Sequence, residues 1–157
     1  GCKGGSVLSA EHGGTSLVLV TTCLAAAAGC IGSLIVSYIR YKNLDLTMFL
    51  NGILGGLVGI TAGADQMSPT DAILIGSIAG AIIVFAVAFI DKLKLDDPVG
   101  AIAVHLICGI WGTLAVGIFG ALAGWDQFVS QLIGVGSYAA ICVSSTFIIL
   151  FILTRIK

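Results

Sequence analysis

Five long apolar stretches constrain this sequence more than any other feature. The hydrocarbon core of a bilayer is about 30 Å thick and is crossed by about 20 helical residues. A single strand in lipid leaves its backbone polar groups without partners, so each stretch is predicted to be a helix. The sequence therefore predicts an all-α integral membrane protein with five transmembrane helices and a single transmembrane domain over residues 1–157. The predicted spans are residues 15–39, 48–64, 70–90, 99–123 and 128–153.

The composition agrees with a membrane protein and argues against several other classes. Only 10% of the residues are charged, whereas soluble domains have about 25%. The net charge of −1, without a basic run, gives no indication of a nucleic-acid partner. The five cysteines have no CxxC spacing and form no ligand-like cluster with histidine. We therefore expect no disulfide framework, no metal site and no cofactor.

Basic side chains lie almost entirely on one side of the predicted spans. Six of the seven Lys and Arg residues follow the first, third or fifth span, and only Lys3 lies on the other side. Because basic residues are enriched in cytoplasmic loops, we expect the N-terminus outside and the C-terminus in the cytoplasm, in a plasma or inner membrane. The N-terminal segment has no signal-peptide pattern, and we expect the chain to be a fragment of a longer protein.

Small residues recur four positions apart in the second and third spans. This spacing allows helix backbones to approach closely, which in lipid replaces the missing hydrophobic driving force. We therefore expect these spans to be buried in a multi-helix body. The glycine pairs are Gly52/Gly56, Gly55/Gly59, Gly59/Gly63 and Gly76/Gly80.

His105 is the only strongly titratable side chain well inside a predicted span. Seven helical residues at about 1.5 Å each place it about 10 Å beyond Pro98, closer to the middle of a bilayer than to its surface. A charge there is costly, so we expect a neutral imidazole, which can pass a proton or hold a small polar molecule. The alternative is a structural histidine that is hydrogen-bonded to a neighbouring backbone carbonyl.

Other polar residues near the spans have structural interpretations. Asp96 and Asp97, followed by Pro98, predict a helix start with a capping carboxylate and a proline in the first turn. Thr61 is predicted to donate a hydrogen bond back to its own helix.

An enzyme would need a second group beside His105. Serine hydrolysis requires a serine presented by another helix, and Ser33, Ser77 and Ser144 are available, but none lies in a GxSxG elbow. One histidine in a helix is weak evidence for a haem ligand. We therefore expect the protein not to be an enzyme.

The fourth span and the residues before it carry an unusual combination of motifs. This segment reads LKLDDPVGAIAVHLICGIWGTLAVGIFG, with DDP, a seven-residue step to His105 and then CGxxG. The second and third spans read NGILGGLVGITAGADQMSPTDAILIGSIAG, and LAAAAG occurs in the first. In this order and spacing the motifs closely resemble the ammonium transporter family, which includes ammonium transporters, methylammonium permeases and Rhesus proteins. The resemblance runs from about residue 4 to the end of the fifth span.

The resemblance implies a fold and an assembly. It implies a homotrimer whose subunits each have eleven transmembrane helices and their own pore. Two five-helix halves are then related by an inverted repeat, an arrangement found in many transporters, and a final helix follows. The five predicted spans resemble helices seven to eleven, the C-terminal half.

The resemblance also implies roles for single residues. His105 matches the second of two histidines that line a narrow hydrophobic pore, and the first belongs to the other half. Leu54 and Ala101 match pore-wall positions, and Thr61 matches a threonine near the outer end of its helix. Ser6 resembles the serine of an external site that recruits ammonium.

The implied function is transport of ammonium or ammonia across the membrane. Methylammonium is a further candidate substrate, and a PII-type regulatory protein at the cytoplasmic face is a candidate partner beside the lipid bilayer. Two alternatives remain open. The chain could be a non-conducting sensor or interaction protein of the same fold, or an inactive truncated fragment.

Overall fold

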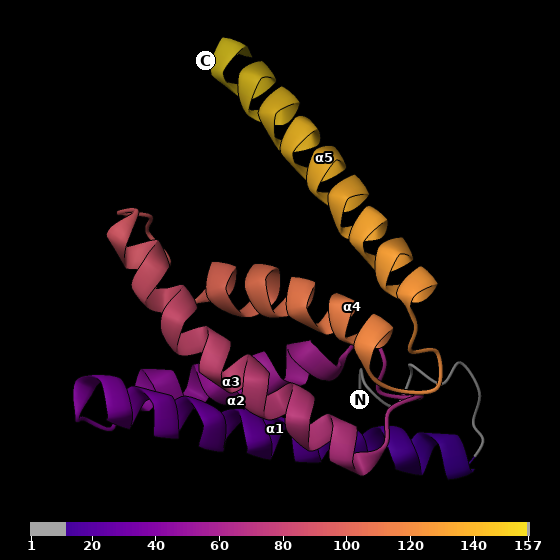
Figure 1. Cartoon of the computed structure of the whole chain (residues 1–157). Coiled ribbons are helices and arrows are strands. Elements are labelled where there is room, and N and C mark those ends of the chain that lie inside the picture. The colour runs from indigo at the N-terminus through magenta and orange to yellow at the C-terminus, as the bar shows by residue number, and fades with distance from the viewer. Residues whose placement is uncertain (1–11, 157) are drawn as a thin grey trace.

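The computed structural model describes residues 12–156, and every regular element in that part of the chain is a helix (Figure 1). Three helices are long and apolar enough to cross a membrane, namely α1, α3 and α5. Two shorter apolar helical stretches lie between them along the chain. The elements in chain order are α1 (His12–Tyr41), α2 (Leu46–Ile60), α3 (Pro69–Lys92), η2 (Ile102–Ile107), α4 (Cys108–Ile118) and α5 (Trp125–Ile156).

The helices follow the five predicted stretches, with two corrections to their ends. The helix α2 ends at Ile60, although the predicted span ran to residue 64, because the next residues form turns. One of these turns brings the carbonyl oxygen of Ala64 to 2.9 Å from Oγ1 of Thr21 in α1. The helix α4 ends at Ile118, although its span was predicted to run to residue 123, because the backbone turns at Gly120 with φ of +84°.

Glycines bring α1, α2 and α3 into backbone contact, as the small-residue spacing predicts. A Cβ added at Gly29 of α1 would lie 2.9 Å from the Cα of Gly56 in α2. A Cβ added at Gly80 of α3 would lie 2.8 Å from the carbonyl carbon of Gly29. Real Cβ atoms are not found at such distances, so the three helices can pack this closely only because these positions are glycine.

Side-chain caps begin α2 and α3. At the start of α2, Oδ1 of Asp45 accepts a hydrogen bond from the backbone N–H of Met48 at 3.0 Å. At the start of α3, Ser68 and Asp71 form a reciprocal capping box. Both caps satisfy backbone donors that a helix start leaves free.

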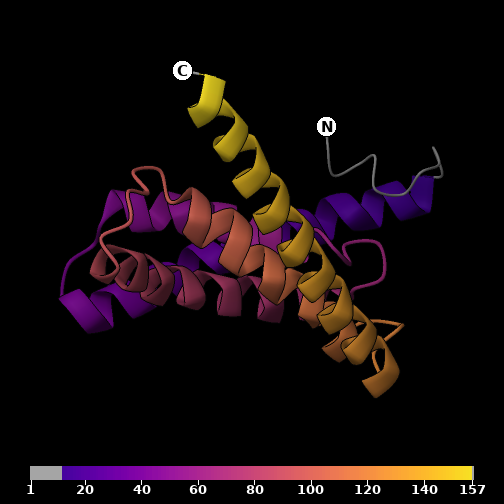
Figure 2. The same ribbon diagram turned by 90° about the horizontal axis from the view of Figure 1, so that it is seen from above.

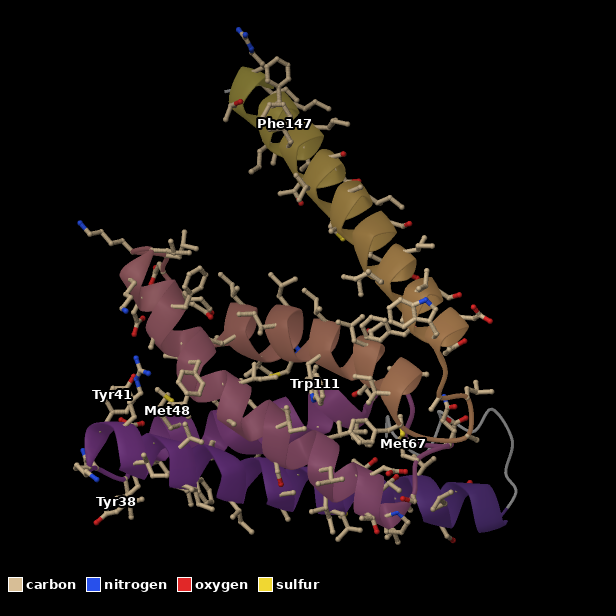
Figure 3. All side chains as sticks on the ribbon, viewed as in Figure 1. Tyr38, Tyr41, Met48, Met67, Trp111 and Phe147 are labelled. Carbon is tan, nitrogen blue, oxygen red and sulfur yellow. The ribbon has the colours of Figure 1, made fainter. Side chains whose placement is uncertain are left out.

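The interior consists of two apolar clusters between these helices. One lies towards the start of α3 and includes Ile60, Met67 and Ile75. The other lies towards the end of α3 and includes Ile83 and Cys108. The indole of Trp111 packs against both clusters, and Figure 3 shows it between α4 and α3. Trp111 therefore connects the two halves of the core.

The helix α5 leaves the bundle that the other elements form. Figure 1 shows it running obliquely away from α4, and in Figure 2, seen from above, it crosses over the other helices. None of its residues is buried among the described residues, although most of them are apolar. Its exposed side chains include Phe147, Ile149 and Phe151. The described chain thus leaves an apolar helix almost without tertiary partners.

Candidate functional site

His105 lies in a π-helical turn, a feature that the sequence did not predict. The six residues of η2 form this turn, and at its end the backbone N–H of Cys108 donates to the carbonyl of Ala103, five residues earlier. An α-helix would pair residues four apart. The extra residue widens the turn, and such turns are frequent at functional sites. The predicted α-helical span is therefore wrong in its local geometry at the position of His105.

The turn divides its side chains between the core and an exposed face. Ala103 and Val104 are buried, with exposed fractions of 0% and 1%. Ala101 and His105 are both exposed. The structure therefore places these two predicted pathway residues on the outer face of one element, with His105 directed away from the core.

A capping carboxylate and a glycine set the start of this turn. Oδ2 of Asp97 accepts hydrogen bonds from the backbone N–H groups of Ile102 and Ala103 at 3.0 and 3.3 Å. The prediction of a capping carboxylate is thus confirmed. The prediction that Pro98 occupies the first helical turn is wrong, because Pro98 lies in a separate turn before the helix.

The reason for the separate turn is the backbone at Gly100. Its φ is +71°, a left-handed conformation that reverses the chain between Pro98 and η2. A Cβ at this position would also lie 2.7 Å from Nδ2 of Asn51, a buried residue of α2. Gly100 therefore fits the start of the His105 helix against α2.

Two contacts hold the helix behind His105 against α3. Nε1 of Trp111 donates a hydrogen bond of 3.1 Å to the carbonyl oxygen of Ile75. The thiol of Cys108 lies 3.7 Å from the carbonyl oxygen of Ala79. Both side chains lie on the side of the helix that faces the core, so they leave the exposed face of His105 unobstructed.

A cavity of about 230 Å³ lies between the His105 face and α5. The imidazole forms no hydrogen bond with a described residue, so in this part of the chain it is not the carbonyl-bonded structural histidine of the alternative. A neighbouring apolar cavity of about 710 Å³ continues along α5 past Leu106, Cys142 and Phe147. The residues that line the smaller cavity are His105, Leu106, Gly109, Ile110, Thr113, Val135, Tyr138, Ala139 and Cys142.

The sequence reasoning did not identify the α5 residues beside His105. Tyr138 and Cys142 line its cavity, although they are more than thirty positions away in the sequence. No local pattern in the chain indicates this pairing, because it depends on the direction in which α5 leaves α4. Of these two α5 residues, Tyr138 carries a hydroxyl that can form a hydrogen bond.

Among the described residues, Ala101, Leu54 and Thr61 do not line the cavity of His105. Leu54 is 43% exposed on α2, which is in contact with η2. Thr61 is exposed just beyond the end of α2 and donates to the carbonyl of Leu57 at 2.7 Å, the back-bond that its sequence predicts. Ser6 lies outside the described residues.

The serines considered for catalysis are not placed as nucleophiles. Oγ of Ser33 donates to the carbonyl of Cys30 at 2.9 Å, and Oγ of Ser144 donates to that of Ala140 at 2.7 Å. Ser77 lies at the close backbone contact between α3 and Gly32 of α1. None of the three lines the cavity beside His105.

Comparison with known proteins places the chain in a well-defined group. The model of the Ammonium Transporter Family matches residues 1–157. The ammonium transporter Amt2 of Archaeoglobus fulgidus is 38% identical over 150 residues, which are 85% of this chain and 32% of that protein.

Two solved structures have the same fold. A structure titled "Sensor Amt Protein" has 34% sequence identity and a TM-score of 0.93, and the match covers 99% of this chain and 40% of the other. A mutant of Mep2 from Candida albicans has 29% identity and a TM-score of 0.90, with 97% and 42% covered. The chain thus spans about two fifths of the length of the solved structures that it matches and about a third of Amt2.

Proposed function

Because the chain belongs to the ammonium transporter family, whose members are embedded in membranes, we propose that it forms one side of a transmembrane pathway for ammonium or ammonia. His105 carries this proposal. It is a titratable side chain in an apolar helix, it faces away from the core, and it lies in a π-helical turn. A group of this kind is costly inside a bilayer unless it serves a polar pathway.

The chemistry of the exposed face favours a neutral solute in the pathway. The residues near His105 are apolar apart from Thr113 and Tyr138. Desolvation in such surroundings penalises a cation strongly. In the proposed mechanism ammonium gives up its proton to solvent water before it enters the apolar section, and ammonia passes along His105, whose neutral imidazole offers one donor and one acceptor.

The other side of the pathway belongs to residues beyond this chain. We propose that a second histidine and an outer aromatic cage lie there, and that the complete protein is a trimer with one pore in each subunit. The distribution of basic residues supports an inner end of the pathway at the α1–α2 and α3–η2 connections. A PII-type protein would dock at these connections.

The test replaces His105 by Ala in the full-length protein and measures ammonium uptake into proteoliposomes. We expect at least a tenfold loss of flux or a loss of selectivity against other small cations. The matched control is Ser144→Ala, which removes a hydroxyl that is bonded only within α5. Unchanged flux and selectivity in a folded His105→Ala protein would contradict the proposal.

A sensor without flux is the second candidate function. It is favoured by the structure titled "Sensor Amt Protein", which matches 99% of this chain with a TM-score of 0.93. A sensor predicts saturable ammonium binding by the full-length protein without ammonium flux into liposomes. Flux well above that of protein-free liposomes would favour the transporter.

A further inference from the structure

A polar cavity of about 270 Å³ lies where α1 and α3 end and α2 begins. It shares no residue with the His105 cavity. Figure 3 shows Tyr41 and Met48 beside each other at this end of the bundle. We call it the end cavity. Its lining residues are Ser37, Tyr41, Asn43, Asp45, Met48 and Asp91.

The end cavity offers oxygen acceptors with a negative charge. Asp45 and Asp91 contribute two carboxylates, and Ser37, Tyr41 and Asn43 contribute further oxygens. Of the carboxylate oxygens, only Oδ1 of Asp45 has a described hydrogen bond, the cap to Met48. Neither carboxylate is hydrogen-bonded or ion-paired to a basic side chain of the described residues. Asp45 and Asp91 are both exposed, and without a basic partner among the described residues they give the cavity a negative potential that attracts a cation.

Two basic side chains at this end, Arg40 and Lys42, lie against aromatic rings. Nε of Arg40 donates to the hydroxyl of Tyr41 at 3.2 Å, and its guanidinium lies 5.3 Å from the ring centre of Phe85. Nζ of Lys42 lies 5.9 Å from the ring centre of Tyr38. The charge of the end cavity is therefore not neutralised by direct contact with either residue.

Ser37 supplies a second, independent indication of a ligand. Its side chain is 1% exposed, and its Oγ has no hydrogen-bond partner among the described residues. Ser33, one turn earlier on the same helix, satisfies its hydroxyl by donating to the carbonyl of Cys30. A buried hydroxyl without a partner costs about 1–3 kcal/mol. A ligand in the end cavity would provide the missing partner.

We propose that the end cavity binds an ammonium ion, an inference that rests on the proposed function. Ammonium donates four hydrogen bonds, and carboxylate, hydroxyl and amide oxygens all accept them. The lining includes no histidine or cysteine, the usual ligands of zinc and copper. Potassium is close to ammonium in size but donates no hydrogen bond, so it is the discriminating competitor.

The site would hold the cation at the end of the helices where the basic residues collect, away from the His105 path. Binding in the end cavity would therefore make the stability of this end of the bundle depend on the ammonium concentration on its own side.

The experiment measures the melting temperature of the full-length protein in detergent with ammonium chloride or with potassium chloride at equal ionic strength. We expect a larger increase with ammonium than with potassium in the unaltered protein. The increase in melting temperature with ammonium beyond that with potassium should disappear in Asp91→Asn and in Asp45→Asn. It should become smaller in Ser37→Ala. Asn is as good a helix cap as Asp, so Asp45→Asn removes the charge but keeps the start of α2.

Ser33→Ala is the matched control, because its hydroxyl is already bonded within α1. It should keep the full ammonium-specific increase. Equal increases with potassium and ammonium, or an unchanged increase in folded Asp45→Asn and Ser37→Ala proteins, would overturn the proposal.

The failure of this inference can be separated from the failure of the proposed function. His105→Ala should keep the ammonium-specific increase, because His105 does not line the end cavity. If His105→Ala abolishes flux and the end-cavity variants retain the increase, only the end-cavity inference fails. If flux does not depend on His105 and the end-cavity variants lose the increase, only the proposed pathway fails.

Discussion

At the scale of single residues, Gly100 decides how the His105 helix begins. Its φ of +71° lies in the region that residues with a Cβ avoid, and Asn51 fills the space where a Cβ would project. Asp97 then caps the next backbone donors. One glycine and one carboxylate thus determine where the π-helical turn starts.

Replacing Gly100 by Ala should lower the free energy of unfolding by about 1–2 kcal/mol from the backbone conformation alone. The contact with Asn51 should add to this loss. The measurement is the unfolding transition of the purified full-length protein. Gly109→Ala is the control, because a Cβ there meets only Val58 at 3.9 Å, an ordinary contact. Equal stability of the two variants would contradict this reading of Gly100.

At the scale of helices, backbone contact and one indole hold the bundle together. Gly29, Gly56 and Gly80 bring α1, α2 and α3 together without side chains between them. The helix with His105 instead uses Trp111, which packs against both core clusters and donates to Ile75 of α3. This contact sets the position of α4, and through α4 that of η2, relative to α3.

Trp111→Phe should cost about 1 kcal/mol of stability, because it removes the hydrogen bond to Ile75 but keeps an aromatic ring. Trp111→Ala should cost about 3–5 kcal/mol, because it also leaves a cavity beside two clusters. Thermal unfolding of the full-length protein gives both values. A Phe variant that is as destabilised as the Ala variant would show that the hydrogen bond matters more than the packing.

At the scale of the whole molecule, the face that carries His105 is open. Ala101, His105 and Leu54 are exposed, and α5 projects from the bundle with no buried residue. A closed pathway needs walls on all sides, because a cation or ammonia in an open groove would be in contact with lipid. The match to 40% of the first solved structure is consistent with walls supplied by further helices.

Residues 1–157 alone should therefore conduct no ammonium. The measurement is ammonium flux into liposomes that contain this segment, with the full-length protein as the positive control. We expect the flux of the segment to equal that of empty liposomes. Flux that is comparable to that of the full-length protein would mean that copies of the segment enclose a pathway on their own.

The sequence by itself determined the membrane class and the order of the helices, and it singled out His105 as a candidate. These depend on local properties, namely the length of uncharged stretches, the spacing of glycines and the cost of a titratable group in lipid. The motifs around DDP and His105 also predicted the family, which the family model confirms over residues 1–157. The roles of His105, Leu54, Ala101, Thr61 and Ser6 stay predictions.

Only the tertiary structure decided the π-helical turn, the early ends of α2 and α4, and the neighbours of His105. Each depends on how segments far apart in the sequence pack, such as Gly100 against Asn51, or the helices that bring His105 and Tyr138 to one cavity. The end cavity has the same origin, because Ser37 and Asp91 meet only when α1 and α3 end side by side. The periodic pattern of a sequence predicts where a helix forms. The space between helices depends on how their backbones pack.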